Sequence, residues 1–192
     1  MCSTGCCGEA GLSWAILAST RRDHFLPIAA AEQLVSDRLR LTPLTVDDAP
    51  EMHRVLADPA LYVFTGESVP SLEQLERRYR MQCAGPGEPD VAWRNWIIRL
   101  SEDGRKVGFV QATVTGDEAA IAWLVGVPWQ RQGVATEATI VMCAWLATQG
   151  IERLVAHIHP EHDASARIAH ALGMTPSAEF DDDGERIWVG TP

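Results

Sequence analysis

Residues 124–138 read Leu124-Val125-Gly126-Val127-Pro128-Trp129-Gln130-Arg131-Gln132-Gly133-Val134-Ala135-Thr136-Glu137-Ala138, and this stretch decides the fold. An apolar strand runs into a short polar loop, and the loop opens a long helix with apolar residues at helical spacing. A helix N-terminus presents unpaired N–H groups and the positive end of the helix dipole, so it binds phosphate readily. Gly133 and Ala135 let the backbone approach a ligand, and Arg131 adds a cation. The stretch therefore predicts a phosphate-binding loop.

Two common nucleotide-binding patterns are missing from this loop. The chain has neither GxxxxGK[ST], the Walker pattern, nor GxGxxG, the dinucleotide pattern. The loop does match the pattern Q/R-x-x-G-x-G/A, with Gln130, Gly133 and Ala135 at its fixed positions.

Outward from the loop, hydrophobic periodicity divides the chain into strands and helices. We expect strands at residues 38–42, 93–100, 106–115, 119–127, 154–158, 175–180 and 186–189, and helices at 45–57, 71–82, 134–149 and 163–172. This order combines antiparallel hairpins with a strand–helix–strand crossover in the second half. It predicts an α/β (α+β) fold with a mixed, twisted central sheet of about six to seven strands and helices on both faces.

Composition limits the class of protein. The chain has 192 residues and a formal net charge of −10, which fits one domain that does not bind nucleic acid. The sequence shows no apolar run of membrane-spanning length, so we expect no membrane association. The five cysteines are odd in number and three crowd into the first seven residues, which fits a reduced, cytoplasmic protein. We expect residues 1–35 to be a poorly ordered extension and 36–192 to be the domain. The apolar content permits a homodimer.

A second motif lies downstream of the phosphate loop. Residues 159–174 read His-Pro-Glu-His-Asp-Ala-Ser-Ala-Arg-Ile-Ala-His-Ala-Leu-Gly-Met. Together with the loop, they resemble the GNAT superfamily of N-acetyltransferases, whose pattern is P-x-N-x-x-S followed by a helix and L-G-F. Pro160, Ser165, Leu172 and Gly173 fit that pattern. The segment from Ala135 to Ala138 resembles the branch that includes ribosomal-protein N-terminal acetyltransferases, and the resemblance covers residues 38 to about 189.

The resemblance implies the cofactor and the reaction. Acetyl-CoA would be the co-substrate, and a primary amine, either a small molecule or a peptide N-terminus, would attack the thioester directly in a ternary complex. The strand before the loop would split from its neighbour through a bulge and pair with the pantetheine arm. The implied cofactor contacts are Val125, Val127, Gln130, Arg131, Gln132, Gly133, Val134, Ala135, Thr136 and His162.

The chain departs from the family pattern at the residues that move protons. His162 replaces the usual Asn, and Ala169 replaces the Tyr that usually acts as general acid. Ser165 is the preferred replacement for that acid, or a cofactor contact, although a Ser near a helix start also bonds the local backbone. Glu118 would act through water, and His157 and His159 would line the cleft beside the acetyl group, where a histidine suits proton shuttling.

Other candidate residues carry alternatives. Phe64 and Glu67 fall where the family forms its acceptor wall, and Glu67 could also be a solvated loop residue. His157, His159 and His162 form an H-x-H-x-x-H cluster. We expect no metal there, because no carboxylate or thiolate sits at matching spacing. The altered proton-transfer residues support an alternative function, a catalytically weak acyl-CoA-binding module that acts as a sensor or partner domain.

Overall fold

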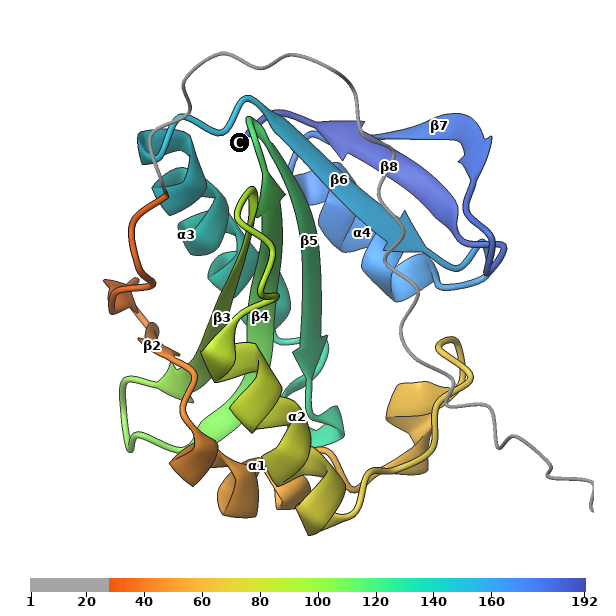
Figure 1. Ribbon diagram of the computed structural model, residues 1–192. Helices are drawn as coiled ribbons and strands as arrows, with labels where there is room; N and C mark the ends of the chain where they lie inside the picture. Colours follow the sequence, from red (N-terminus) through yellow and green to blue (C-terminus); the bar gives the residue numbers. More distant parts are fainter. Residues whose placement is uncertain (1–27) are drawn as a thin grey trace, which may run out of the picture.

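The computed structural model describes residues 28–192 (Figure 1). Of the extension expected at residues 1–35, residues 1–27 lie outside the described residues. The remainder includes a short strand, β1 (Leu34–Val35), which pairs with β2 (Leu39–Pro43). The described structure therefore includes residues 28–35, which the sequence assigned to the extension.

The strands form one mixed sheet, as the sequence predicts. Its order is β1-β2-β3-β4-β5-β6-β8-β7, and neighbours are antiparallel except for β5 and β6. The eight strands exceed the expected number because β1 adds an edge strand. The strands not yet given are β3 (Val91–Leu100), β4 (Lys106–Thr115), β5 (Glu118–Val125), β6 (Arg153–Ile158), β7 (Thr175–Phe180) and β8 (Arg186–Gly190).

Helices cover both faces of the sheet (Figure 1). One apolar cluster joins the sheet to α3 and α4, and a second joins it to α1 and α2. The helices are α1 (Ala49–Val55), α2 (Leu72–Ala84), α3 (Val134–Thr148) and α4 (Asp163–Ala171), with 3₁₀ turns η1 (Val46–Asp48), η2 (Pro59–Tyr62) and η3 (Val127–Trp129).

The helix expected at residues 45–57 is divided between η1 and α1. Thr45 precedes η1, and its N–H and Oγ1 both donate to Asp48 Oδ2, at 2.8 and 2.9 Å. Asp48 is 3% exposed and also forms ion pairs with Arg99 and Lys106. Asp48 thus anchors this face of the molecule.

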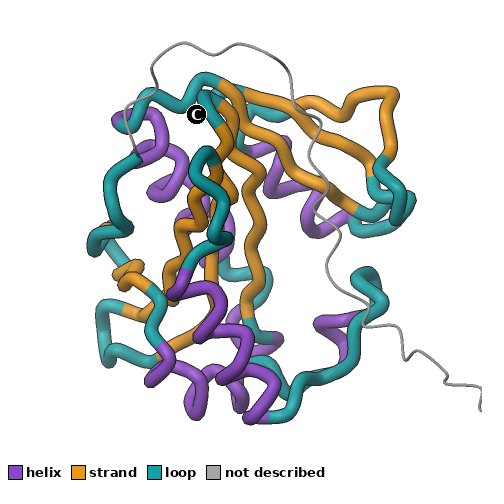
Figure 2. The backbone as a smooth tube through the Cα atoms, viewed as in Figure 1, coloured by secondary structure: helices purple, strands orange, loops and turns teal. Residues whose placement is uncertain are grey.

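The sheet opens between β5 and β6. These strands pair only where residues 118–120 of β5 meet residues 153–155 of β6, and beyond that point they diverge (Figure 2). The expected bulge is not the cause, because β5 keeps a continuous register with β4 from Glu118 to Val125. Instead β6 leaves β5 and continues in register with β8. This divergence leaves a split between β5 and β6 whose open end lies at the C-terminal end of β5, next to residue 126.

Candidate active site

The predicted phosphate loop is held in shape by its own side chains. Gln130 Nε2 donates to the Val125 carbonyl at 3.0 Å, and Gln132 Nε2 donates to the Pro128 carbonyl at 2.9 Å. Arg131 and Gly133 both have positive φ, 59° and 77°. Glycine adopts this conformation without strain, whereas Arg131 adopts it at a cost. The two glutamines, expected as cofactor contacts, thus organise the loop.

The N-terminus of α3 has unsatisfied donors. Gly133 is the N-cap and supplies no side-chain cap, and the first helical bond runs from the Glu137 N–H to the Gly133 carbonyl at 2.9 Å. The N–H groups of Val134, Ala135 and Thr136 therefore have no partner within the helix. Together with the helix dipole they form an anion-binding position at the open end of the split.

Arg38 and Glu137 brace this loop, and sequence reasoning did not identify them. Arg38 pairs with Glu137 and also donates from Nη1 to the Gln132 carbonyl at 3.2 Å, while Ser36 Oγ donates to Glu137 Oε1 at 2.7 Å. Partial burial acts to raise the pKa of Glu137, but the bonds from Ser36 and Arg38 outweigh it and hold that pKa below its ordinary value. No local pattern signals this pair, because about a hundred residues separate its members in the chain.

The backbone groups that face the split belong to alternate residues of β5. Asp117 O accepts from β6, and Val125 O faces away from β4, whereas the Gly126 N–H donates to Val107 of β4. By strand alternation, odd-numbered residues direct their N–H and C=O groups into the split. Beyond the paired segment these are Ile121, Trp123 and Val125; Trp123 and Val125 lie nearest the open end, and the Val125 carbonyl is already bonded to Gln130. Val127, expected in this strand, lies in η3 beyond the end of β5.

Three rings meet across the cleft from different parts of the chain. The Phe64 ring stacks on His162 with centroids 4.4 Å apart and lies 5.3 Å from His159. His162 is the N-cap of α4 and its Nδ1 accepts the Ser165 N–H at 3.5 Å. Burial, and then the neighbouring His159, lower the pKa of His162. The segment between α1 and α2 is thus joined to the segment between β6 and α4.

The remaining predicted residues are held by local partners. Glu118 pairs with Arg153 at 2.9 Å, at the closed end of the split. Glu67 pairs with Arg78 at 3.3 Å. Ser165 lies partly buried in the first turn of α4.

An open cleft connects these groups. Its lining includes the phosphate loop, the residues of β5 that border the split, and the ring cluster. The loop at one end can hold an anion, and the cleft between it and the rings can hold an extended chain.

Comparison with known proteins identifies the family. The family model described as "Acetyltransferase (GNAT) domain" matches residues 38–175. The chain therefore belongs to the GNAT acetyltransferase family, as its two motifs predict. No curated protein sequence matches the chain significantly.

Solved structures share this fold at low sequence identity. A GNAT-family acetyltransferase from Bacillus anthracis is 18% identical with a TM-score of 0.70, over 83% of this chain and 98% of that one. The ribosomal L7/L12 alpha-N-protein acetyltransferase RimL, in complex with coenzyme A, is 17% identical with a TM-score of 0.70 over the same shares. The microcin C7 self-immunity acetyltransferase MccE, in complex with acetyl-CoA and AMP, is 14% identical with a TM-score of 0.67, over 82% and 94%. Within residues 28–192, no helix combines the length and apolarity needed to cross a membrane.

Proposed function

We propose that this protein is an acetyl-CoA-dependent N-acetyltransferase that acetylates a primary amine by direct attack in a ternary complex. The observation that carries the proposal is the split between β5 and β6, which ends at the uncapped N-terminus of α3. Backbone groups that lack a strand partner suit an amide-containing chain, and unpaired helix N–H groups suit a pyrophosphate. Acetyl-CoA contains both groups, and two of the similar structures contain coenzyme A or acetyl-CoA.

The loop and β5 would bind different parts of the cofactor. The N–H groups of residues 134–136, with the Arg131 side chain, would hold the pyrophosphate. Trp123 and the Val125 N–H would pair with the pantetheine amides. When bound, acetyl-CoA supplies the thioester that the amine attacks. A β5 N–H directed into the split would stabilise the negative charge that develops on the carbonyl oxygen.

Proton transfer is assigned to residues near the rings. The Nδ1 atom of His159 accepts the Glu161 N–H at 3.2 Å, so the neutral ring carries its proton on Nε2 and suits a donor role. Ser165, at the start of α4, is the hydroxyl closest in sequence to His162, which caps its N–H. Glu118 is paired with Arg153, so it would act only through water.

The acceptor would bind beside Phe64, against the rings of His159 and His162. Glu67 already pairs with Arg78, so binding an acceptor ammonium would require Glu67 to share its charge. One of the similar proteins is the ribosomal L7/L12 alpha-N-protein acetyltransferase. This similarity supports a peptide N-terminus as one acceptor class, beside small amines.

One observation favours a second function, an acyl-CoA-binding module with weak turnover. The helix position at which the family carries a Tyr is Ala169, which is fully buried. No hydroxyl can protonate the leaving thiolate from that position. Binding without thiol release would distinguish this module from an enzyme.

Calorimetry with acetyl-CoA tests the cofactor site. The native chain should bind with a dissociation constant on the order of micromolar. Gly133→Asp and Gly133→Asn form a matched pair, because both side chains tolerate positive φ and only Asp adds a charge. We expect Asp to weaken binding at least about tenfold more than Asn, since a tenfold change corresponds to about 1.4 kcal/mol of repulsion.

A thiol-release assay over small amines and peptides then tests turnover. Release with at least one amine supports the enzyme. Binding without release across the panel supports the sensor module. If the native chain does not bind acetyl-CoA, both functions are wrong.

A further inference from the structure

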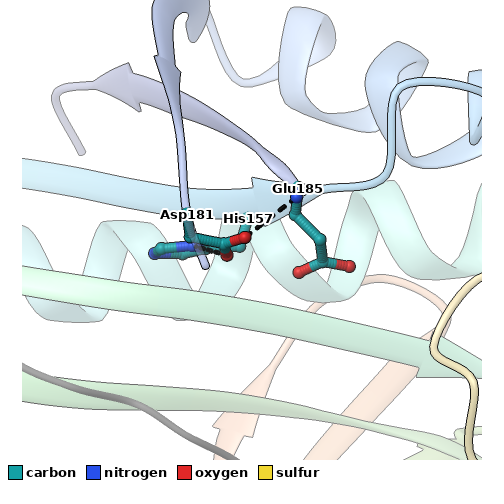
Figure 3. Close-up of side chains that lie close together, drawn as sticks. All are labelled: His157, Asp181 and Glu185. Atoms are coloured by element: carbon teal, nitrogen blue, oxygen red, sulfur yellow. Dashed lines mark hydrogen bonds and ion pairs between the residues drawn. The ribbon is translucent and has the colours of Figure 1, made fainter. Parts of the chain in front are cut away.

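The structure brings two carboxylates to His157. Of the three histidines in the H-x-H-x-x-H cluster, this is the one that does not belong to the ring cluster. The sequence predicts no metal site because no carboxylate or thiolate sits at matching spacing to the histidines. Asp181 and Glu185 come instead from the turn between β7 and β8, next to His157 on β6 (Figure 3). All three residues are partly buried and line the cleft described above.

Strand pairing and the turn hold two of these side chains in position. His157 is in register with Ile187 of β8, the strand that follows the turn. Asp181 Oδ1 accepts the N–H groups of Asp183 at 3.0 Å and of Glu185 at 2.9 Å. Its other oxygen, Oδ2, lies 2.6 Å from His157 Nδ1. In metal sites, hydrogen bonds to a coordinating carboxylate fix its orientation, and the two backbone N–H groups bonded to Asp181 Oδ1 would do this here.

The cluster carries more negative than positive charge. Two carboxylates face one imidazole, and ligand atoms of the three residues lie within 4.8 Å of one another. Burial, and then repulsion from Asp181, raise the pKa of Glu185. A cation between the two carboxylates would remove this repulsion.

We propose that His157, Asp181 and Glu185 bind a divalent cation of the zinc class. One imidazole nitrogen with two carboxylate oxygens suits Zn²⁺ and similar ions, whereas Mg²⁺ and Ca²⁺ prefer oxygen ligands alone. Zinc binds such atoms at about 2.0–2.2 Å. On binding, Asp181 Oδ2 must therefore separate from His157 Nδ1, now 2.6 Å away, and the Glu185 carboxylate must approach the ion. Three protein ligands leave a fourth position for water or a cleft ligand.

Zinc titration of the full-length, chelator-treated chain tests the site. Calorimetry should show one ion per chain at this cluster, and His157→Ala, Asp181→Asn and Glu185→Gln should each weaken it at least about tenfold, as loss of metal-site partners does. His159→Ala is the matched control, because His159 directly follows β6, the strand that carries His157, but its ring lies against Phe64. It should leave zinc affinity unchanged.

The N-terminal cysteines Cys2, Cys6 and Cys7 are a competing zinc site and need their own control. A full-length chain with all three changed to Ser should keep the ion. Cobalt(II) bound to the native chain should show visible d–d bands without the thiolate charge-transfer band that cysteine ligands produce. This spectrum needs no variant, so it stays informative if a variant fails to fold. Binding lost in the Ser variant, unaffected by His157→Ala, or missing altogether overturns the proposal.

Discussion

His162 shows how one substitution changes the work done at a family position. The family pattern has Asn there, and in this chain the imidazole caps α4 and stacks on Phe64. The cap requires Nδ1 to accept the Ser165 N–H, so it exists only while Nδ1 carries no proton. Burial lowers the pKa of His162 in the folded chain and thus favours that neutral form.

This lowered pKa makes stability depend on pH. In the unfolded chain His162 titrates near its ordinary value of 6.5, so below that pH the unfolded state binds a proton that the folded state does not. The free energy of unfolding should therefore fall as pH drops from about 7.5 to about 5.5. His162→Asn should fall less over the same range, measured by urea unfolding.

His53→Asn serves as the control for this measurement, since His53 lies on α1, away from the ring cluster. It should reproduce the native pH dependence. A His162→Asn variant that loses as much stability as the native chain would contradict the assignment.

At the residue scale, the sequence predicts those residues whose role depends on the conformation of the neighbouring backbone. Gly133 lies at the helix start with positive φ, and the motif alone indicates it. Arg38 is beyond such reasoning, because its partner Glu137 is distant in the chain and close only after folding. Val127 was placed in the strand for another reason: the strand ends at Val125, two residues earlier than expected, so Val127 is not one of its residues.

Among the elements, the charged group beneath α1 joins a helix to two strands. Asp48 pairs with Arg99 of β3 at 2.8 Å and with Lys106 of β4 at 3.0 Å. Lys106 also pairs with Glu51 at 3.2 Å. The Asp48 and Lys106 side chains are almost fully buried, so neither charge can turn to water if its partner is lost.

Replacing Asp48 should therefore destabilise the fold. Asp48→Asn keeps the shape but leaves Arg99 and Lys106 with less negative charge, and we expect the free energy of unfolding to fall by about 3 kcal/mol. The neighbouring Asp47 is exposed, so Asp47→Asn should change it by less than about 0.5 kcal/mol. Chemical denaturation measures both, and equal effects would show that the buried group adds no stability.

Most helices and strands follow from periodicity and end signals. Ser71 and Gln74 form the capping box that starts α2, and Gly85 ends it with positive φ. The buried side of α3 is wide, since Thr139, Met142 and Leu146 are buried as well as Val134 and Ala138. Contacts of α3 with both the sheet and the β1–β2 segment explain this, and a single helical period cannot reveal them.

Viewed as a whole, the molecule is fastened by residues that precede its first long strand. The Glu32 carbonyl accepts the Trp96 indole N–H at 2.8 Å, and Glu32 Oε1 accepts the Trp145 indole N–H at 2.9 Å. Arg94 donates to the carbonyls of Ile28 and Ala29. Residues 28–35 thus join β3 to α3.

Two truncated chains test this fastening. A chain that begins at Ile28 keeps these bonds, and one that begins at Ser36 leaves two buried indole N–H groups unpaired and removes buried Leu34. Each unpaired group costs about 1–3 kcal/mol, so the shorter chain should melt at least about 6 °C lower. Equal melting temperatures would show that residues 28–35 are dispensable.

The split between β5 and β6 places two strand edges inside one sheet. Unpaired edges usually recruit other chains and lead to aggregation. Here the two edges face each other, joined at the closed end by a three-residue seam. The gap tapers toward this seam, which favours a slim, extended guest over a folded partner. The unpaired backbone N–H and C=O groups of the split can thus bind an extended ligand without promoting edge-to-edge association between copies of this protein.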